Sequence, residues 1–298
     1  MELNNISDKE IILELKNRLQ EKAICEQQVK DLNISLKKLN RKLKESESMK
    51  SHFISNIRNE IINPFTSILA IAENILDVEK ENWKKVIHMV SLIHTEVFNL
   101  DFQLRNIFAA AELEAGENEP DITLVNIDKT IQHVIDTFKY EARRKHLKIE
   151  YVSANKNSNT KMYFKSDAEK IQIIISNLIS NAIKFSYNEG IILIKVTKQE
   201  NNLRLTVKDE GQGISKTNEQ IIFDRFKRID TGINSLNRGH GLGLSIIKAM
   251  IDSLDGKIEF SSRLGKGATF TIQLYESEKE TSGISNDADE LFFREEKF

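Results

Sequence analysis

The feature that most constrains the fold is a long uninterrupted helical pattern near the N-terminal end. Residues 8–50 contain neither proline nor glycine and are dense in Lys, Glu, Leu and Gln. Apolar residues in this stretch fit one heptad register of alternating steps of three and four. They are Ile11, Leu15, Cys25, Val29, Leu32, Leu36, Leu39 and Leu43, and Phe53 and Ile57 continue the register. Polar Arg18, Lys22, Ser46 and Lys50 interrupt it. We predict a parallel dimeric coiled coil over residues 1–50. A single amphipathic helix docked on another protein is the alternative.

Residues 51–116 carry two further apolar stripes at helical spacing. The first consists of Ile57, Ile61, Ile68, Ala72 and Ile75, and Pro64 within it predicts a kink because proline lacks an N–H. The second follows a turn at 77–81 and consists of Val86, Val90, Ile93, Val97, Leu100, Leu104, Ile107 and Ala111. Gly116 and Pro120 are stop signals for this helix. Pairing two such hairpins would bury both stripes, so we predict a dimeric four-helix bundle with two helices per chain.

From Asp121 the pattern changes to mixed α/β. Helices are expected at 129–145, 167–185 and 242–254, and strands at 147–153, 191–198, 203–208, 257–262 and 268–274. This pattern predicts one domain over residues 117–276. The polar, acidic tail at 277–298 is expected to be mobile, although its aromatic end, which includes Phe292 and Phe293, could instead dock on a partner or on the chain itself. The chain is therefore expected to be multidomain, as its 298 residues suggest.

Composition excludes several classes of protein. A net charge of −2 gives no support for nucleic acid or an anionic membrane surface as partner. The single cysteine, Cys25, excludes an internal disulfide framework and suits a reducing compartment. No apolar run reaches the ~18 residues that a membrane span requires. We therefore expect a cytoplasmic protein without membrane insertion, whose input comes from a partner, the coiled coil or another chain.

Four short motifs between residues 177 and 244 are each weak signals but together are specific. They are Asn177-Leu-Ile-Ser-Asn181-Ala-Ile-Lys184-Phe185, Asp209-Glu-Gly211-Gln-Gly213, Phe223-Asp-Arg225-Phe226 and Gly239-His-Gly241-Leu-Gly243. Asn177 and Asn181 lie four apart and so share one helix face, where their amide oxygens suit Mg²⁺. Helix capping or a plain polar face is the alternative for these asparagines. A Rossmann interpretation fails because no βαβ unit precedes the glycines.

The four motifs resemble the N, G1, F and G2 boxes of the GHKL ATPase superfamily, which supplies the catalytic domain of histidine kinases. The resemblance implies a Bergerat-type α/β sandwich that binds ATP and Mg²⁺. Asn181 is then the surest metal ligand, with Asn177 beside it, and Asp209 accepts the adenine amino group. The remaining implied nucleotide contacts are Lys184, Phe185, Gly211, Gly213, Arg225, Gly239, Gly241 and Gly243. Lys184 and Arg225 would meet the phosphates, and Phe185 would pack against adenine.

Residues 53–68 resemble the H-box of sensor histidine kinases, where a histidine five residues before the proline is phosphorylated. In this chain that position is Asn59. Position 59 lies on a polar helical stripe, which a solvated helix face would also explain. A carboxamide nitrogen is not nucleophilic because its lone pair is delocalised into the carbonyl, so autophosphorylation at Asn59 is not expected. Glu60 and Asn63 retain the spacing of the family's phosphatase pair, for which an ordinary helix surface is the alternative.

Three hypotheses follow for a homodimer of this kind. The first is an ATP-binding pseudo-histidine kinase in two-component signalling, which acts by conformation, by docking a response regulator or by dephosphorylating it. The second is an active kinase that phosphorylates another histidine, such as His52, His88 or His94, or a partner protein in trans. The third is a coiled-coil interaction module whose nucleotide site is only structural.

Overall fold

The computed structural model describes residues 8–79, 82–116, 119–154, 161–219, 221–224 and 242–278. The chain divides into two units, residues 1–58 and 59–298, and each is described by itself. The sequence predicts a polar loop at 155–160, and this segment and the aromatic end of the tail lie outside the described residues. No helix within these ranges combines the length and the apolar character that a membrane crossing requires.

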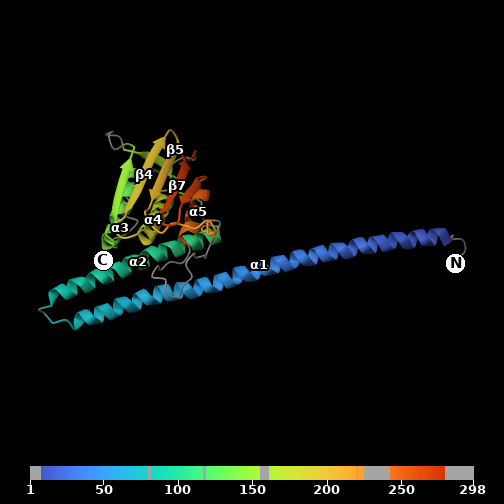
Figure 1. The fold of residues 1–298 in the computed structure, drawn as a ribbon, viewed down its shortest axis with the longest axis horizontal. Coiled ribbons are helices and arrows are strands. Elements are labelled where there is room, and N and C mark those ends of the chain that lie inside the picture. The colour runs from blue at the N-terminus through green and yellow to red at the C-terminus, as the bar shows by residue number, and fades with distance from the viewer. Residues whose placement is uncertain are drawn as a thin grey trace. The chain divides into compact units, whose positions relative to one another are not determined.

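Helix α1, Asp8–Leu76, begins in the first unit and ends in the second (Figure 1). The leucines of the predicted heptad register are exposed in the single chain, and Leu32 and Leu39 are among the most exposed apolar residues. An exposed stripe of this kind agrees with a helix that needs a partner but does not identify the partner, so the coiled coil remains a prediction. The helix continues through Pro64, which is buried.

Helix α2, Trp83–Ala115, is the second arm of the predicted hairpin. Gly116 ends it in the left-handed conformation, with φ 78°, and donates its N–H to the carbonyl of Glu112. Glycine adopts this conformation without the penalty that a Cβ would bring. The stop signal expected at Gly116 is therefore confirmed.

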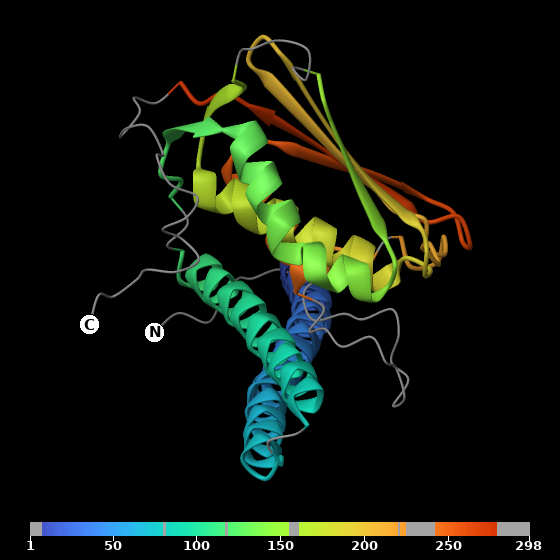
Figure 2. The same cartoon turned by 90° about the vertical axis from the view of Figure 1, so that its left-hand side faces the viewer.

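The α/β domain is a five-stranded sheet, order β2-β4-β5-β7-β6, with a separate two-stranded sheet of β1 and β3. Strands β2 and β4 are parallel, and the other neighbours in the larger sheet are antiparallel. The elements are β1 Thr123–Asn126, α3 Ile127–Arg144, β2 Lys148–Ser153, β3 Tyr163–Ser166, α4 Ala168–Phe185, β4 Ile191–Gln199, β5 Asn202–Lys208, α5 Gly243–Ser253, β6 Lys257–Ser262 and β7 Ala268–Tyr275. Figure 2 shows α3 and α4 covering one face of the larger sheet.

The core forms between those helices and the inward face of the sheet. Alternate residues of β4 and β5 are buried, as period-two patterning requires when one face packs on helices. On the helical side, α4 buries Ile171, Ile174, Ile175, Leu178 and Ile179. The asparagines of the first motif lie on the same helix, where Asn177 is also buried and Asn181 is half-buried.

Each predicted element of this domain is confirmed to within two residues, but β1 and β3 were not predicted. These strands have four residues each, too few to show a periodic pattern. They pair antiparallel, with Leu124 opposite Lys165. This pairing places β1, the first strand of the domain, beside β3, which leads into α4.

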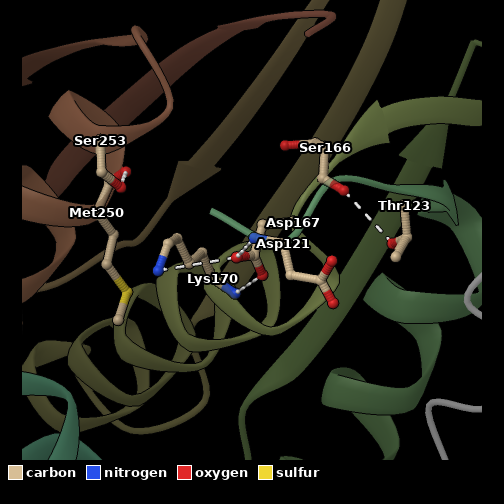
Figure 3. A network of polar contacts seen from close by, with 7 residues as sticks. All are labelled: Asp121, Thr123, Ser166, Asp167, Lys170, Met250 and Ser253. Atoms are coloured by element: carbon tan, nitrogen blue, oxygen red, sulfur yellow. Dashed lines mark hydrogen bonds and ion pairs between the residues drawn. The ribbon is translucent and has the colours of Figure 1, made fainter. Parts of the chain in front are cut away.

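A polar network holds the N-terminal end of α4 (Figure 3). Asp167 accepts the backbone N–H of Lys170 at 2.9 Å, as an N-cap, and the backbone N–H of Asp121 at 3.0 Å. The Lys170 ammonium lies 3.7 Å from the same carboxylate. Thr123 donates its hydroxyl to the carbonyl of Ser166 at 3.4 Å. Asp167 therefore fixes where α4 starts, and with it the register of the asparagines further along.

Candidate functional site

Asn177 and Asn181 lie one turn apart on α4, next to the first turn of α5. Asn177 is 3% exposed and donates its amide nitrogen to the carbonyl of Ile173 at 3.0 Å and to Oδ1 of Asn106 on α2 at 2.6 Å. A Cβ placed on Gly243 would lie 2.8 Å from Oδ1 of Asn177 and 3.8 Å from Nδ2 of Asn181. The two asparagines and the first residue of α5 therefore converge.

This arrangement fits a Mg²⁺ ion. Oδ1 of Asn177 packs against Gly243, where any side chain would clash with it, and amide oxygens are among the hard ligands that Mg²⁺ accepts while it keeps several waters. Within the described ranges, no group of three or more His, Cys, Asp or Glu residues could hold a metal instead. The amide pair on α4 is therefore the candidate for a metal in this part of the chain.

Asp209 follows β5 and is 6% exposed. Its Oδ1 accepts the backbone N–H of Ala268 at 3.2 Å. Burial raises the pKa of this carboxyl to about 6, although hydrogen bonds from the backbone N–H groups of Ala268 and Gly211 oppose the rise. A buried carboxylate with a pKa this close to neutrality is typical of a functional site.

The two glycines after Asp209 are required by the packing of the chain on itself. A Cβ on Gly211 would lie 2.1 Å from the carbonyl oxygen of Phe185, and one on Gly213 would lie 2.2 Å from that of Arg263. Gly213 also has a φ of 68°, in the left-handed region. The family resemblance implied that these glycines contact nucleotide. The structure gives a reason for both glycines that needs no ligand.

The C-terminal end of α4 carries Lys184 and Phe185, with the Lys184 ammonium 5.2 Å from the centre of the Phe185 ring. Lys145, at the end of α3, donates its ammonium to the carbonyls of Ile183 at 2.8 Å and Lys184 at 2.7 Å. Burial lowers the pKa of Lys145. A cation at this helix end satisfies carbonyls that have no partner within the helix.

Sequence reasoning missed Lys145 and Asn106. Lys145 lies 38 residues before Ile183, and Asn106 lies 71 residues before Asn177. No spacing rule links residues so far apart. Asn106 is also a single polar residue beside the apolar stripe of α2, which gives no signal of a contact with the motif on α4.

Several predicted site residues lie outside what the structure describes. These are Arg225, Gly239 and Gly241, together with the side chains of Asn59 and Glu60, whose backbone lies in α1. Asn63 is exposed on α1. Phe223, which precedes Arg225 by two residues, packs edge-on against Phe260, with ring centres 5.8 Å apart.

Comparison with known proteins agrees with the motifs. Residues 166–278 match the family described as histidine kinase-, DNA gyrase B- and HSP90-like ATPase. The chain is 28% identical over 278 residues to hybrid signal transduction histidine kinase D of Dictyostelium discoideum, across 91% of this chain and 18% of that protein. It is 28% identical to sensor histidine kinase WalK of Bacillus subtilis, across 79% of this chain and 39% of that protein.

Sensor-like histidine kinase SenX3 of Mycolicibacterium smegmatis is 26% identical, across 77% of this chain and 58% of that protein. The chain thus spans from about a fifth to about three fifths of the length of these relatives. Among solved structures, full-length ShkA in complex with AMPPNP is similar in fold, with a TM-score of 0.52 at 20% identity over 76% of this chain and 46% of that one. The ATPase match at 166–278 and the relatives that extend over the helical region together support a relationship of this chain to the sensor histidine kinases.

Proposed function

We propose that this chain is a degenerate histidine kinase of two-component signalling, which binds Mg-ATP and does not phosphorylate itself at position 59. It would act by conformation, by docking a response regulator or by dephosphorylating one. The observation that carries the proposal is the combination of Asn59 at the phosphoacceptor position with convergence of Asn177, Asn181 and Gly243 at the α4–α5 junction.

In this proposal, different residues of the chain contact the base, the phosphates and the metal. Asp209 accepts the adenine amino group, and Asn181 and Asn177 hold Mg²⁺, which neutralises phosphate charge when bound. Lys184 and Arg225 meet the phosphates, and the N–H groups of Gly239, Gly241 and Gly243 lie before or at the start of α5, where oriented dipoles favour anions. Phe185 packs against the base, and Gly211 and Gly213 shape the loop beside it.

The chemistry at position 59 separates this chain from an active kinase. A neutral imidazole can attack a γ-phosphate near pH 7, whereas the carboxamide of Asn59 offers no free nitrogen lone pair. Glu60 and Asn63 keep the spacing of a phosphatase pair, in which an amide orients the attacking water. Asn63 is exposed on α1, as a residue that acts on a docked regulator must be.

We further propose that a second copy of the chain covers the helical hairpin. Leu76 is 85% exposed and Val97 is 48% exposed, and Leu69, Ile87 and Val90 are also exposed. Apolar faces of this extent on one hairpin indicate an interaction surface, and two hairpins can bury them in a four-helix bundle. The proposed domains are the coiled coil at 1–50, the hairpin at 51–116, the ATP-binding domain at 117–276 and the tail at 277–298.

A second candidate is an active kinase that uses a different histidine. The exposure of His88 on α2 favours this alternative, because an acceptor must be reachable. His94 is exposed as well, and its ring lies edge-on to Tyr140 with centres 6.3 Å apart. The coiled-coil module with a structural nucleotide site is a third candidate.

Labelling with γ-phosphate-labelled ATP tests the proposal. The parent should bind Mg-ATP and acquire no label, whereas Asn59→His should acquire a label that is labile in acid and stable in base, as a phosphoramidate is. Arg58 and Ile62, which differ from the family pattern, would make this restoration partial. The matched control combines Asn59→His with Asn181→Ala and should lose the label.

Equal labelling of the parent and Asn59→His would overturn the proposal. If the label on the parent maps to His52, His88 or His94, the second candidate replaces it. A parent that binds nucleotide, with neither protein labelled and no effect of nucleotide on response-regulator dephosphorylation or docking, would favour the third.

A further inference from the structure

We propose that Asn106 on α2 is a positioning residue for metal binding, which holds the side chain of Asn177 so that its oxygen faces Gly243. The helical hairpin would then set the Mg²⁺ affinity of the nucleotide site. This inference rests on the proposed binding of Mg-ATP.

The orientation of both amides follows from their backbone partners. Asn106 donates its nitrogen to the carbonyl of Phe102 at 3.1 Å, and Asn177 donates its nitrogen to the carbonyl of Ile173 at 3.0 Å. A carbonyl only accepts, so each contact must be made by an amide nitrogen. Oδ1 of Asn106 therefore faces Asn177, and Oδ1 of Asn177 faces away from α2.

The second contact completes the hydrogen bonding of the Asn177 nitrogen. An amide nitrogen has two hydrogens, and Asn177 directs one to Ile173 and the other to Asn106 at 2.6 Å. Asn177 is 3% exposed and Asn106 is 7% exposed, so little water is available to replace Asn106. A buried N–H without a partner is unfavourable. Removal of the acceptor would leave this N–H unpaired and only the Ile173 carbonyl to hold the amide, so the oxygen would be held less firmly beside Gly243.

Oδ1 of Asn177, which takes no part in these hydrogen bonds, lies beside Gly243. The position that a Cβ would occupy at this residue is 2.8 Å from Oδ1 of Asn177. The first residue of α5 thus leaves room for the oxygen, and this helix end is where we place the polyphosphate. Asn106 has no need to touch nucleotide or metal, because it acts through Asn177.

Aromatic contacts keep α2 in place for this role. The ring of Phe138 on α3 lies edge-on to Phe98 at 5.4 Å and to Phe102 at 5.6 Å between centres. Phe102 is also the residue whose carbonyl holds Asn106. Any change that shifts α2 along α3 and α4 would therefore change the orientation of Asn177. By linkage, Mg-nucleotide would in turn strengthen the contact of α2 with the domain.

The test is equilibrium binding of ATP to the full chain, with excess Mg²⁺ and again with EDTA, in which the ratio of the two affinities reports the metal. Asn106→Leu removes the acceptor at similar volume. Loss of a partner that orients a metal ligand typically lowers metal affinity by 10- to 100-fold, so the ratio should fall about tenfold or more. Affinity in EDTA should stay within about twofold, because the adenine contact at Asp209 is intact.

Three further variants make the result specific. Asn106→Asp keeps an oxygen acceptor for Asn177 and should keep at least most of the ratio. Asn106→Ser is too short to reach Asn177 and should lose it as Asn106→Leu does, even if the leucine variant does not fold. Thr95→Val is the control, since Thr95 is buried on α2 but bonds only the carbonyl of Ser91.

The inference is overturned if the ratio is unchanged in both Asn106→Leu and Asn106→Ser, if Asn106→Asp loses as much as they do, or if affinity in EDTA falls in parallel. A parent that binds no ATP under either condition refutes the proposed function itself. That outcome is distinct, because it is seen before any variant is made.

Discussion

The acidity of Asp209 makes a quantitative prediction for adenine recognition. The Asp209 carboxylate accepts backbone N–H groups, among them that of Ala268 on Oδ1, and its two oxygens have about four acceptor sites, so we expect one of them to accept the adenine amino group. Only the ionised form offers that oxygen as an acceptor without a competing proton. With a pKa of about 6, the carboxyl is nearly all ionised at pH 8. At pH 5 it is roughly one-eleventh ionised, so the affinity for ATP should be about tenfold lower than at pH 8.

Asp209→Asn removes the charge of this side chain but keeps its shape, so it tests what the carboxylate contributes to ATP affinity. If the asparagine oxygen takes the Ala268 N–H, its NH₂ group meets the adenine amino group, and two donors face each other. Leaving such a buried group unpaired costs roughly 1–3 kcal/mol, which lowers ATP affinity about 5- to 150-fold at pH 8. GTP should lose less than ATP, because guanine presents a carbonyl where adenine presents an amino group.

The assay is ATP binding between pH 5 and 8 at fixed free Mg²⁺. The phosphates of ATP also titrate near pH 6, so the variant supplies the baseline and the difference between the two profiles belongs to Asp209. Superimposed profiles, or equal affinities at pH 8, would refute the assignment of Asp209 to adenine.

In the absence of nucleotide, the pH dependence of folding stability is opposite to that of ATP affinity: acid favours the folded state. The pKa in the folded state is raised from 3.8 to about 6, so the native state favours the protonated carboxyl. The resulting stabilisation is fully present below the unfolded value and is lost as pH rises through about 6. The melting temperature of the parent should therefore rise relative to that of Asp209→Asn between pH 7 and pH 5. An unchanged difference in melting temperature would indicate that the carboxyl is not buried as described.

The remaining predictions concern other parts of the chain. Asn181→Ala should abolish the dependence of ATP binding on Mg²⁺ without changing the far-UV circular dichroism spectrum, and unchanged dependence would remove Asn181 from the site. Val97→Glu combined with Leu104→Glu should leave monomers or unfolded chain by light scattering, because charges would replace the proposed bundle face; a stable dimer would contradict it. Lys145→Met should destabilise the domain by roughly 1–3 kcal/mol in urea unfolding, because two part-buried carbonyls lose a cationic donor; an unchanged transition would show that water replaces the ammonium.

Periodic patterns predicted the ATPase domain well because its helices and strands bury one face. The strand predicted at 191–198 is observed as Ile191–Gln199, in which alternate residues are buried. The motifs predicted a helix for Asn177, and the structure has this residue in α4, with Asp209 directly after β5 and Gly243 at the start of α5; their roles in a nucleotide site stay predictions. The short strands Thr123–Asn126 and Tyr163–Ser166 were invisible, because four residues form a sheet only through pairing with a distant segment.

Contacts between distant segments set the limit of prediction for the site as well. The ammonium of Lys145 on the last carbonyls of α4 depends on how α3 packs beside α4. The amide pair of Asn106 and Asn177 depends on the packing of α2 against the domain. Neither contact leaves a pattern in a single sequence. The sequence also could not show why glycine is needed after Asp209, because a side chain there would clash with the carbonyl oxygens of Phe185 and Arg263, which are distant in the sequence.

The backbone clash that requires Gly211 and Gly213 makes these glycines weaker evidence for a working nucleotide site than Asp209 is. Gly211 and Gly213 would be required even in an inert domain, because any side chain there would meet backbone. Asp209 is different. Burial works against its ionised form, as the raised pKa shows, so the carboxylate is a liability for folding near neutral pH. A residue that destabilises the free domain needs a compensating role, and such residues concentrate at functional sites. Asp209, more than the glycines around it, therefore favours a protein that binds nucleotide over one that merely keeps the fold.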